Sequence, residues 1–204
     1  MKFERIVNSF IDENTYIIYE NDTCIIVDPG SDFEKIDGVI QEHGFKNIYI
    51  YLTHAHIDHV ASCEKLVAKY NCPIYTHELE LPLLQKPIKG MTLIFDKDIE
   101  VKNAIGIKDK LDIPGFDLII HHVPGHTHGH SMLEVPKLNA LFTGDFVFYH
   151  EIGRCDLPTG DIYEMYDSLD NKLALMNPKL EIYPGHGQSS TVGEEIKHNP
   201  YMNR

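Results

Sequence analysis

Residues 53–59 of the chain read THAHIDH, a stretch that places three imidazoles and one carboxylate within seven positions. The apolar run 48–52 before it predicts a buried strand, and apolar side chains at helical spacing over 60–70 predict a helix after it. The stretch is therefore expected on a strand-to-helix turn, where polar side chains can converge on one point outside the core.

The ligand types in this stretch favour a catalytic metal site. Neutral imidazoles with a carboxylate suit zinc, iron or manganese, whereas a calcium site uses oxygens alone. A structural zinc site more often uses closely spaced cysteine pairs and a closed ligand shell. The four cysteines here form no C-x-x-C pair, and we expect reduced thiols, mostly in the core, at Cys24, Cys63, Cys72 and Cys155. A reactive thiol at Cys155, which lies among charged residues, is the alternative.

Length and charge narrow the possible functions. A chain of 204 residues suits one domain with a substantial core, and no apolar run reaches membrane-spanning length. The first residues contain no apolar secretion segment, so we expect a cytoplasmic protein without a membrane partner. The net charge of −13 argues against a nucleic-acid partner, which needs a basic face. A small-molecule substrate is expected, and the oligomeric state is left open.

Several predicted strands lead directly to a possible metal ligand. The strands and the residues that follow them are 48–52 and His54, 117–123 and His126, 138–143 and Asp145, and 180–183 and His186. Helices are expected over 32–43 and over 161–176, the second with Asp161 as its N-cap. Residues 79–90 are expected as helix and loop, and 91–114 as hairpin strands. This alternation suggests two packed sheets with helices outside.

Seven candidate ligands result, and they are too many for one tetrahedral ion, which needs three or four protein ligands. Two ions that share Asp145 as a bridge use all seven. We expect the first ion on His54, His56 and His126, and the second on Asp58, His59 and His186. Two ions roughly 3.5–4 Å apart can hold a bridging hydroxide and polarise a carbonyl. Zinc is expected, with iron and manganese as alternatives. Asp28, at the end of the predicted strand 23–27, is either a plain turn residue or a residue near the metals.

Four stretches also carry a family resemblance: THAHIDH at 53–59, PGHT at 124–127, FTGD at 142–145 and YPGHG at 183–187. They resemble the motifs of the metallo-β-lactamase-fold hydrolases, and within them the glyoxalase II-like branch, in family order over nearly the whole chain. The resemblance implies an α/β fold, an αββα four-layer sandwich, as a single domain over 1–204. The chain ends soon after its last ligand loop, so we expect no separate C-terminal glutathione-binding helical domain, as in the short members of the branch.

The resemblance also implies the chemistry. The expected reaction is hydrolysis of a thioester such as S-D-lactoylglutathione, with Asp58 binding the second metal and orienting the attacking hydroxide. Arg154 matches the position where this branch directs a basic residue toward the substrate; the alternative is a surface arginine in a charged loop. His128 and His130 are not counted as ligands.

Other functions of the same fold give the competing hypotheses. A persulfide dioxygenase with one iron typically has a Pro-Ala-His-Asp type of final loop, whereas this chain has PGHG at 184–187. A hydrolase of another small ester or thioester remains open. A non-catalytic module of this fold should have lost ligands, and all seven are present.

Overall fold

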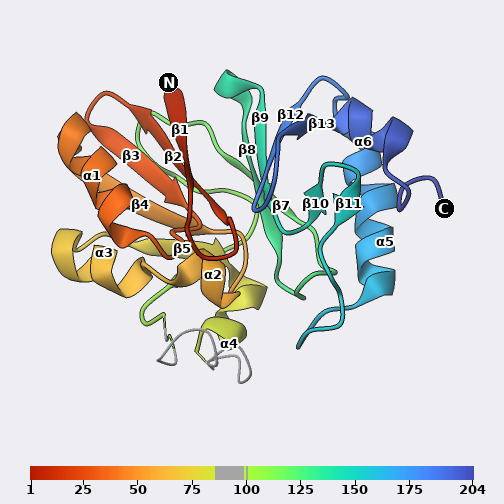
Figure 1. The fold of residues 1–204 in the computed structure, drawn as a ribbon, viewed down its shortest axis with the longest axis horizontal. Coiled ribbons are helices and arrows are strands. Elements are labelled where there is room, and N and C mark those ends of the chain that lie inside the picture. The colour runs from red at the N-terminus through yellow and green to blue at the C-terminus, as the bar shows by residue number, and fades with distance from the viewer. Residues whose placement is uncertain (86–98, 100) are drawn as a thin grey trace. The chain divides into compact units, whose positions relative to one another are not determined.

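A computed structural model of the chain describes residues 1–85, 99 and 101–204. The chain separates into two compact units, Met1–Gly106 and Ile107–Arg204. Each unit has its own sheet and its own helices, and Figure 1 colours them from red at the N-terminus to blue at the C-terminus.

The first unit is built on a six-stranded sheet in which strand order follows chain order. Its strands are β1 (Lys2–Val7), β2 (Asn14–Glu20), β3 (Thr23–Val27), β4 (Asn47–Leu52), β5 (Ile74–His77) and β6 (Ile105–Ile107). The pairs β1–β2 and β2–β3 are antiparallel, whereas β3–β4 and β4–β5 are parallel. Parallel neighbours need long crossover connections, and helices supply them here.

These crossover helices cover one face of the first sheet. They are α1 (Phe33–His43) between β3 and β4, and α2 (Ile57–Val60) with α3 (Cys63–Tyr70) between β4 and β5 (Figure 1). A 3₁₀ turn, η1 (Glu78–Glu80), and the short helix α4 (Leu81–Leu84) follow β5. The core joins helix and sheet residues that are fully buried, among them Ile26, Ile36, Ile50 and Leu66.

The second unit has a five-stranded sheet with the order β13-β12-β9-β8-β7. Its strands are β7 (Ile119–His122), β8 (Ser131–Val135), β9 (Ala140–Gly144), β12 (Glu181–Pro184) and β13 (Ser190–Thr191), and a separate hairpin contains β10 (Val147–Phe148) and β11 (Glu151–Ile152). The helical elements are η2 (Pro136–Leu138), α5 (Ile162–Asn171), η3 (Leu173–Leu175) and α6 (Val192–His198). Met165 and Leu169 of α5 pack with Leu141 and Ile182 of the sheet.

Strand register brings the ends of neighbouring strands together in both units. Val27 of β3 is opposite Tyr51 of β4, and the amide of Asp28 donates to the carbonyl of Tyr51 at 3.0 Å. In the second unit, Gly144 of β9 is opposite Pro184 of the parallel strand β12. The residues that follow these strands therefore start from the same edge of their sheet.

Two predicted helices differ from the observed ones. The helix expected after the THAHIDH stretch is divided into α2 and α3, because Ser62 donates from its amide to the carbonyl of Pro29 at 3.0 Å and from its hydroxyl to the carbonyl of Gly30. The helix expected over 161–176 ends at Asn171, since Lys172 leaves helical geometry with φ −127° and ψ −67°. The Lys172 ammonium donates to the carbonyl of His122.

The structure describes only part of two other predicted segments, 79–90 and 91–114. The helix expected in 79–90 is observed as η1 and α4, and of the hairpin expected over 91–114 the strand β6 is observed. Residues 86–98 and 100 lie outside the described residues, as does that part of both predictions. None of the described helices has the length and apolar character that crossing a membrane requires.

The N-cap of α5 gives a stability prediction. The Asp161 carboxylate accepts hydrogen bonds from the amides of Tyr163 (2.7 Å) and Glu164 (3.2 Å), as the sequence predicts for an N-cap. Asp161→Ala should lower the free energy of unfolding by about 1 kcal/mol, because two amides at the helix end lose their acceptor. Asp161→Asn is the matched control and should retain most of the stability in urea denaturation. Equal losses in both variants would contradict the capping role.

Candidate metal centre

Four of the seven predicted ligands come together in the first unit. His54 and His56 follow β4, and Asp58 and His59 lie in the short helix α2; all four are at most 5% exposed. The ring of His54 is 4.7 Å from that of His56 and 4.2 Å from that of His59, measured between centroids. The Asp58 Oδ2 atom lies 3.4 Å from Nε2 of His59. The turn thus gathers three imidazoles and a carboxylate in a buried cluster.

Asp28 fixes this turn and orients two of its imidazoles. Its carboxylate accepts from the amide of Thr53 (2.8 Å), from the Thr53 hydroxyl (2.6 Å) and from Nδ1 of His59 (3.1 Å). Because the Thr53 hydroxyl gives its proton to Asp28, its oxygen accepts from Nδ1 of His54 at 3.0 Å. Both rings therefore carry the proton on Nδ1 and keep Nε2 as the basic nitrogen, which is the arrangement of metal-binding histidines.

This network decides between the two interpretations of Asp28. Ligand atoms of Asp28, His54 and His59 lie within 4.8 Å of one another, so the carboxylate belongs to the neighbourhood of the candidate centre. Its oxygens already accept from Thr53 and His59. Asp28 therefore supports the ligands and is not counted as one.

Glu13 is a second buried acid behind His59 that the sequence did not single out. Its Oε1 atom lies 3.8 Å from Nδ1 of His59, and its Oε2 accepts from Asn8 at 2.6 Å and from Thr15 at 3.2 Å. Burial raises the pKa of the Glu13 carboxyl well above its usual range, and the nearby Asp28 carboxylate adds to this shift, whereas the neighbouring His59 opposes it. A Cβ atom at Gly30 would come within 2.1 Å of the same carboxyl group, so the turn after β3 requires glycine there.

The other three predicted ligands come together in the second unit. Asp145 follows β9, and its Oδ2 lies 3.6 Å from Nε2 of His126 while its Oδ1 lies 3.7 Å from Nε2 of His186. Zinc binds imidazole nitrogen and carboxylate oxygen at about 2.0–2.2 Å, so each of these separations leaves room for an ion in contact with both atoms. A carboxylate with one oxygen directed to each of two histidines has the geometry of a bridging ligand.

The loop after β11 holds His126 in place. Nδ1 of His126 donates to the carbonyl of Arg154 at 2.7 Å, which keeps Nε2 basic and directs it to Asp145. A Cβ atom at Gly153 would lie 1.8 Å from the carbonyl oxygen of Asp145 and 2.9 Å from Nδ1 of His126. The Gly153-Arg154 pair of the sequence is thus explained in part by close backbone packing against two ligands.

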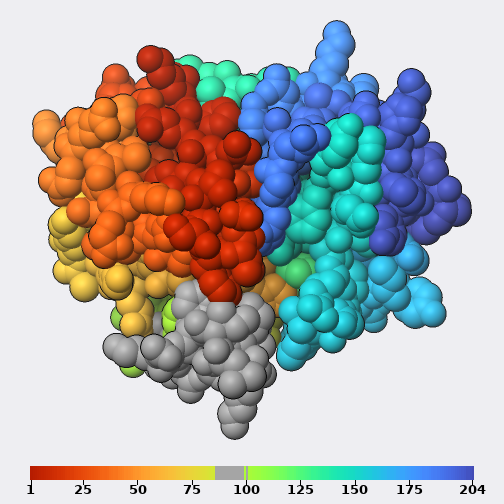
Figure 2. Space-filling view, viewed as in Figure 1, coloured from red at the N-terminus to blue at the C-terminus, as the bar shows by residue number. Residues whose placement is uncertain are grey.

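The Arg154 side chain is exposed, and the residue lies in the segment that follows β11. Figure 2 shows part of the surface of the second unit in green to blue. Its guanidinium makes a bidentate pair with Asp156, at 2.6 Å from Nε and 2.7 Å from the terminal nitrogen. The hydrogen bond from Arg154 lowers the pKa of Asp156 to about 2, so the pair is charged at neutral pH. The guanidinium that the sequence predicted as a substrate clamp is held by a neighbouring carboxylate.

Three further residues that the sequence singled out, His128, His130 and Cys155, are not among the predicted ligands. His128 is exposed, with Nδ1 3.2 Å from Glu164, and His130 is fully buried with its ring 5.8 Å from that of His126. Burial raises the pKa of the Cys155 thiol to about 11, which opposes a reactive thiolate at neutral pH. All four cysteines are free thiols, and three of them are buried.

Glu80 is the other residue near the ligands that the sequence did not reveal. It is fully buried at the end of η1, and its Oε1 accepts from the amide of Ala55 at 2.8 Å. Neither Glu13 nor Glu80 has a diagnostic spacing to the THAHIDH stretch. No local pattern identifies either residue.

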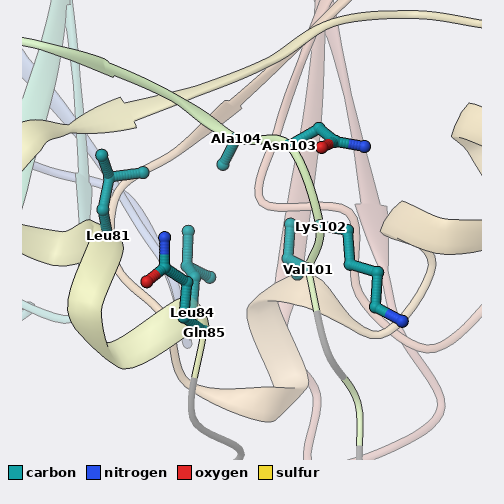
Figure 3. Close-up of a pocket in the computed structure, with 7 residues that line it drawn as sticks. All are labelled: Leu81, Leu84, Gln85, Val101, Lys102, Asn103 and Ala104. Carbon is teal, nitrogen blue, oxygen red and sulfur yellow. The ribbon is translucent and has the colours of Figure 1, made fainter.

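A separate cavity of about 380 Å³ lies in the first unit between α4 and residues 101–104 (Figure 3). Its described lining consists of Leu81, Leu84, Gln85, Val101, Lys102, Asn103 and Ala104. None of the predicted ligands is among these residues, and we assign the cavity no part in the centre.

The profile of the Metallo-beta-lactamase superfamily matches residues 9–186, a range that includes all seven predicted ligands. The chain belongs to this superfamily. As a metallo-beta-lactamase superfamily protein it is a metal-dependent hydrolase, and both the α/β class and the metallo-β-lactamase fold predicted from the sequence are confirmed.

Two curated relatives are similar to this protein over almost its whole length. The probable metallo-hydrolase YqgX of Bacillus subtilis is 30% identical over 100% of this chain and 98% of its own. The hydroxyacylglutathione hydrolase GloC of Haemophilus influenzae is 31% identical over 100% of this chain and 99% of its own.

Similar solved structures agree with the assignment to this superfamily. The B3 metallo-beta-lactamase BLEG-1 is 29% identical with a TM-score of 0.91, and each chain is covered completely. TTHA1623, solved in a di-iron-bound form, is 30% identical with a TM-score of 0.84 over 97% of this chain and 99% of its own.

The position of Asp145 between two histidines gives a direct prediction. Asp145→Ala should lose bound metal and hydrolytic activity together, because a bridging carboxylate serves both ions. Elemental analysis and an activity assay on the same folded preparation measure this. Asp156→Ala, an exposed carboxylate of the same unit, is the control and should keep its metal. A folded Asp145→Ala protein with two ions per chain would rule out the bridging role.

Proposed function

We propose that the chain is a dinuclear metal-dependent thioesterase that hydrolyses small acyl-thiol substrates of the S-D-lactoylglutathione kind. The observation that carries the proposal is the Asp145 carboxylate, with one oxygen directed to His126 and the other to His186. The 31% identity to the hydroxyacylglutathione hydrolase GloC supports the substrate class.

The donor set fits a pair of divalent ions. The proposal assigns the ions to His54, His56 and His126 and to Asp58, His59 and His186, with Asp145 shared. Supporting this, hydrogen bonds at Nδ1 keep Nε2 basic in His54, His59 and His126. When bound, the ions supply a hydroxide nucleophile at neutral pH and polarise the substrate carbonyl. We propose zinc; the di-iron form of TTHA1623 supports iron as the first alternative, and manganese also suits the ligands.

The chain's own residues orient the reactants. Asp58, 3.4 Å from His59 in the buried cluster, is proposed to accept a hydrogen bond from the nucleophile and direct its lone pair to the carbonyl carbon. A thiol has a pKa near 8.5, so it departs as a thiolate and needs no general acid, whereas an amine leaving group does. This difference favours thioesters over amides.

The partners follow from the charge of the protein. With a net charge of −13, we propose a small-molecule substrate and no nucleic-acid or membrane partner. We propose further that residues 1–204 act as one functional domain.

The role of Arg154 in binding substrate gives a second prediction. If its guanidinium holds an anionic thiol carrier, Arg154→Ala should raise KM and leave kcat unchanged, because ground-state and transition-state binding are lost equally. Asp156→Asn should release the guanidinium and lower KM for an anionic thioester roughly two- to fivefold, in line with the weak energy of exposed ion pairs. Both effects should fade at high salt.

An uncharged thioester provides the control, since neither substitution should change its KM. A fall in kcat alone for Arg154→Ala would show that Arg154 does not hold the substrate in the ground state.

A second candidate function, hydrolysis of a β-lactam, is favoured by the similarity to the B3 metallo-beta-lactamase BLEG-1. A persulfide dioxygenase is the alternative within the fold, and it would use one iron.

One experiment separates these functions. Metal content per chain is measured, and the same preparation is assayed with S-D-lactoylglutathione, with a cephalosporin and, in an oxygen electrode, with glutathione persulfide. Two ions with thioester hydrolysis are expected. A single iron with oxygen uptake would replace the proposal by the dioxygenase, and turnover of the cephalosporin alone would replace it by the lactamase.

A further inference from the structure

Glu80 is a fully buried carboxylate that lies against the ligand turn of the first unit. Its Oε1 atom accepts a hydrogen bond of 2.8 Å from the amide of Ala55, the residue between His54 and His56. Burying a carboxyl group is costly unless hydrogen bonds compensate for lost water, and the Ala55 amide supplies such a bond. The contact therefore constrains the peptide unit that joins the two histidines.

The sheet topology explains how residue 80 reaches residue 55. β5 is parallel to β4, with Leu52 opposite Thr76, so the segment after β5 runs beside the segment after β4. β3 flanks β4 on its other side, and the residue after it, Asp28, holds the amide of Thr53. The ligand turn is thus held by two carboxyl groups, each from the segment that follows a strand next to β4. Figure 1 shows β3, β4 and β5 of this sheet.

We infer that Glu80 is a positioning residue for the metal ligands His54 and His56, acting through the backbone amide of Ala55. The inference rests on the proposed function in one respect, namely that these two histidines bind an ion. Asp28 orients the rings of His54 and His59 through Nδ1, whereas Glu80 sets the backbone between His54 and His56. Its loss should therefore weaken the ion that these two histidines share more than the other.

Three variants test the inference on metal-free protein. Glu80→Ala removes the acceptor, Glu80→Gln keeps an acceptor oxygen without the charge, and Glu78→Ala is the matched control, an exposed glutamate of the same 3₁₀ turn. Zinc affinity is measured by competition with a chromophoric chelator, and the amide of Ala55 is followed by NMR chemical shift and hydrogen exchange. Neither readout uses catalytic activity.

The expected pattern is specific. Glu80→Ala should weaken one of the two bound ions roughly ten- to a hundredfold, as loss of an outer-shell partner typically does, and the Ala55 amide should exchange faster. Glu80→Gln should stay within about threefold of the wild type, because its side-chain oxygen can still accept the hydrogen bond. Glu78→Ala should match the wild type in both readouts.

Other results would overturn the inference. Wild-type zinc affinity in folded Glu80→Ala protein would do so, as would an equal loss in Glu78→Ala. If Glu80→Ala fails to fold, Glu80→Asp shortens the side chain by one methylene, and unchanged affinity with an unchanged Ala55 amide in that variant would also refute it. A wild-type protein that binds none of zinc, iron and manganese would instead refute the proposed function, while the Ala55 measurements would still test the contact.

Discussion

The Asp28 carboxylate makes the interaction on which the ligand turn depends. It receives three hydrogen bonds, from the amide and hydroxyl of Thr53 and from Nδ1 of His59, and through the Thr53 hydroxyl it also orients His54. A buried carboxylate is tolerated only when such donors compensate for lost hydration. The register of β3 and β4 places Asp28 where it can fix the proton of His54 and of His59 on Nδ1. The same carboxylate therefore connects two strands and orients two predicted ligands.

Much of the local structure could be predicted from the sequence because its signals are short-range. The run 48–52 and the THAHIDH stretch identify a strand and the turn after it, and Asp161 marks the start of α5. Helix ends were harder to predict. Apolar spacing continues past Asn171, yet the helix stops there, and Ser62 divides another helix by bonding to Pro29 and Gly30. Those bonds join segments about thirty positions apart, which periodicity does not register.

The supporting acids were missed for the same physical reason. Glu80 contacts Ala55 across 25 positions, and Glu13, directly before β2, approaches His59 from a distant part of the sequence. Neither glutamate belongs to a sequence motif, because the role of each one depends on tertiary contacts alone. Arg154 shows a different case: a motif indicated a side-chain role, which stays a prediction, and the structure adds a backbone role, since the Arg154 carbonyl accepts from His126 while the guanidinium pairs with Asp156. A residue type identifies possible chemistry, but the contacts decide which atom performs it.

Holding the ligand turn from both neighbouring strands has a consequence for metal acquisition. The conformational entropy of ordering this turn is lost when the chain folds, and it need not be lost again when an ion arrives. Zinc fingers show the contrasting behaviour, since their chains remain unfolded until metal binds. A preorganised turn allows ions to exchange without refolding of the surrounding sheet. Occupancy would then follow the supply of each metal in the cell and its intrinsic preference for nitrogen and oxygen ligands.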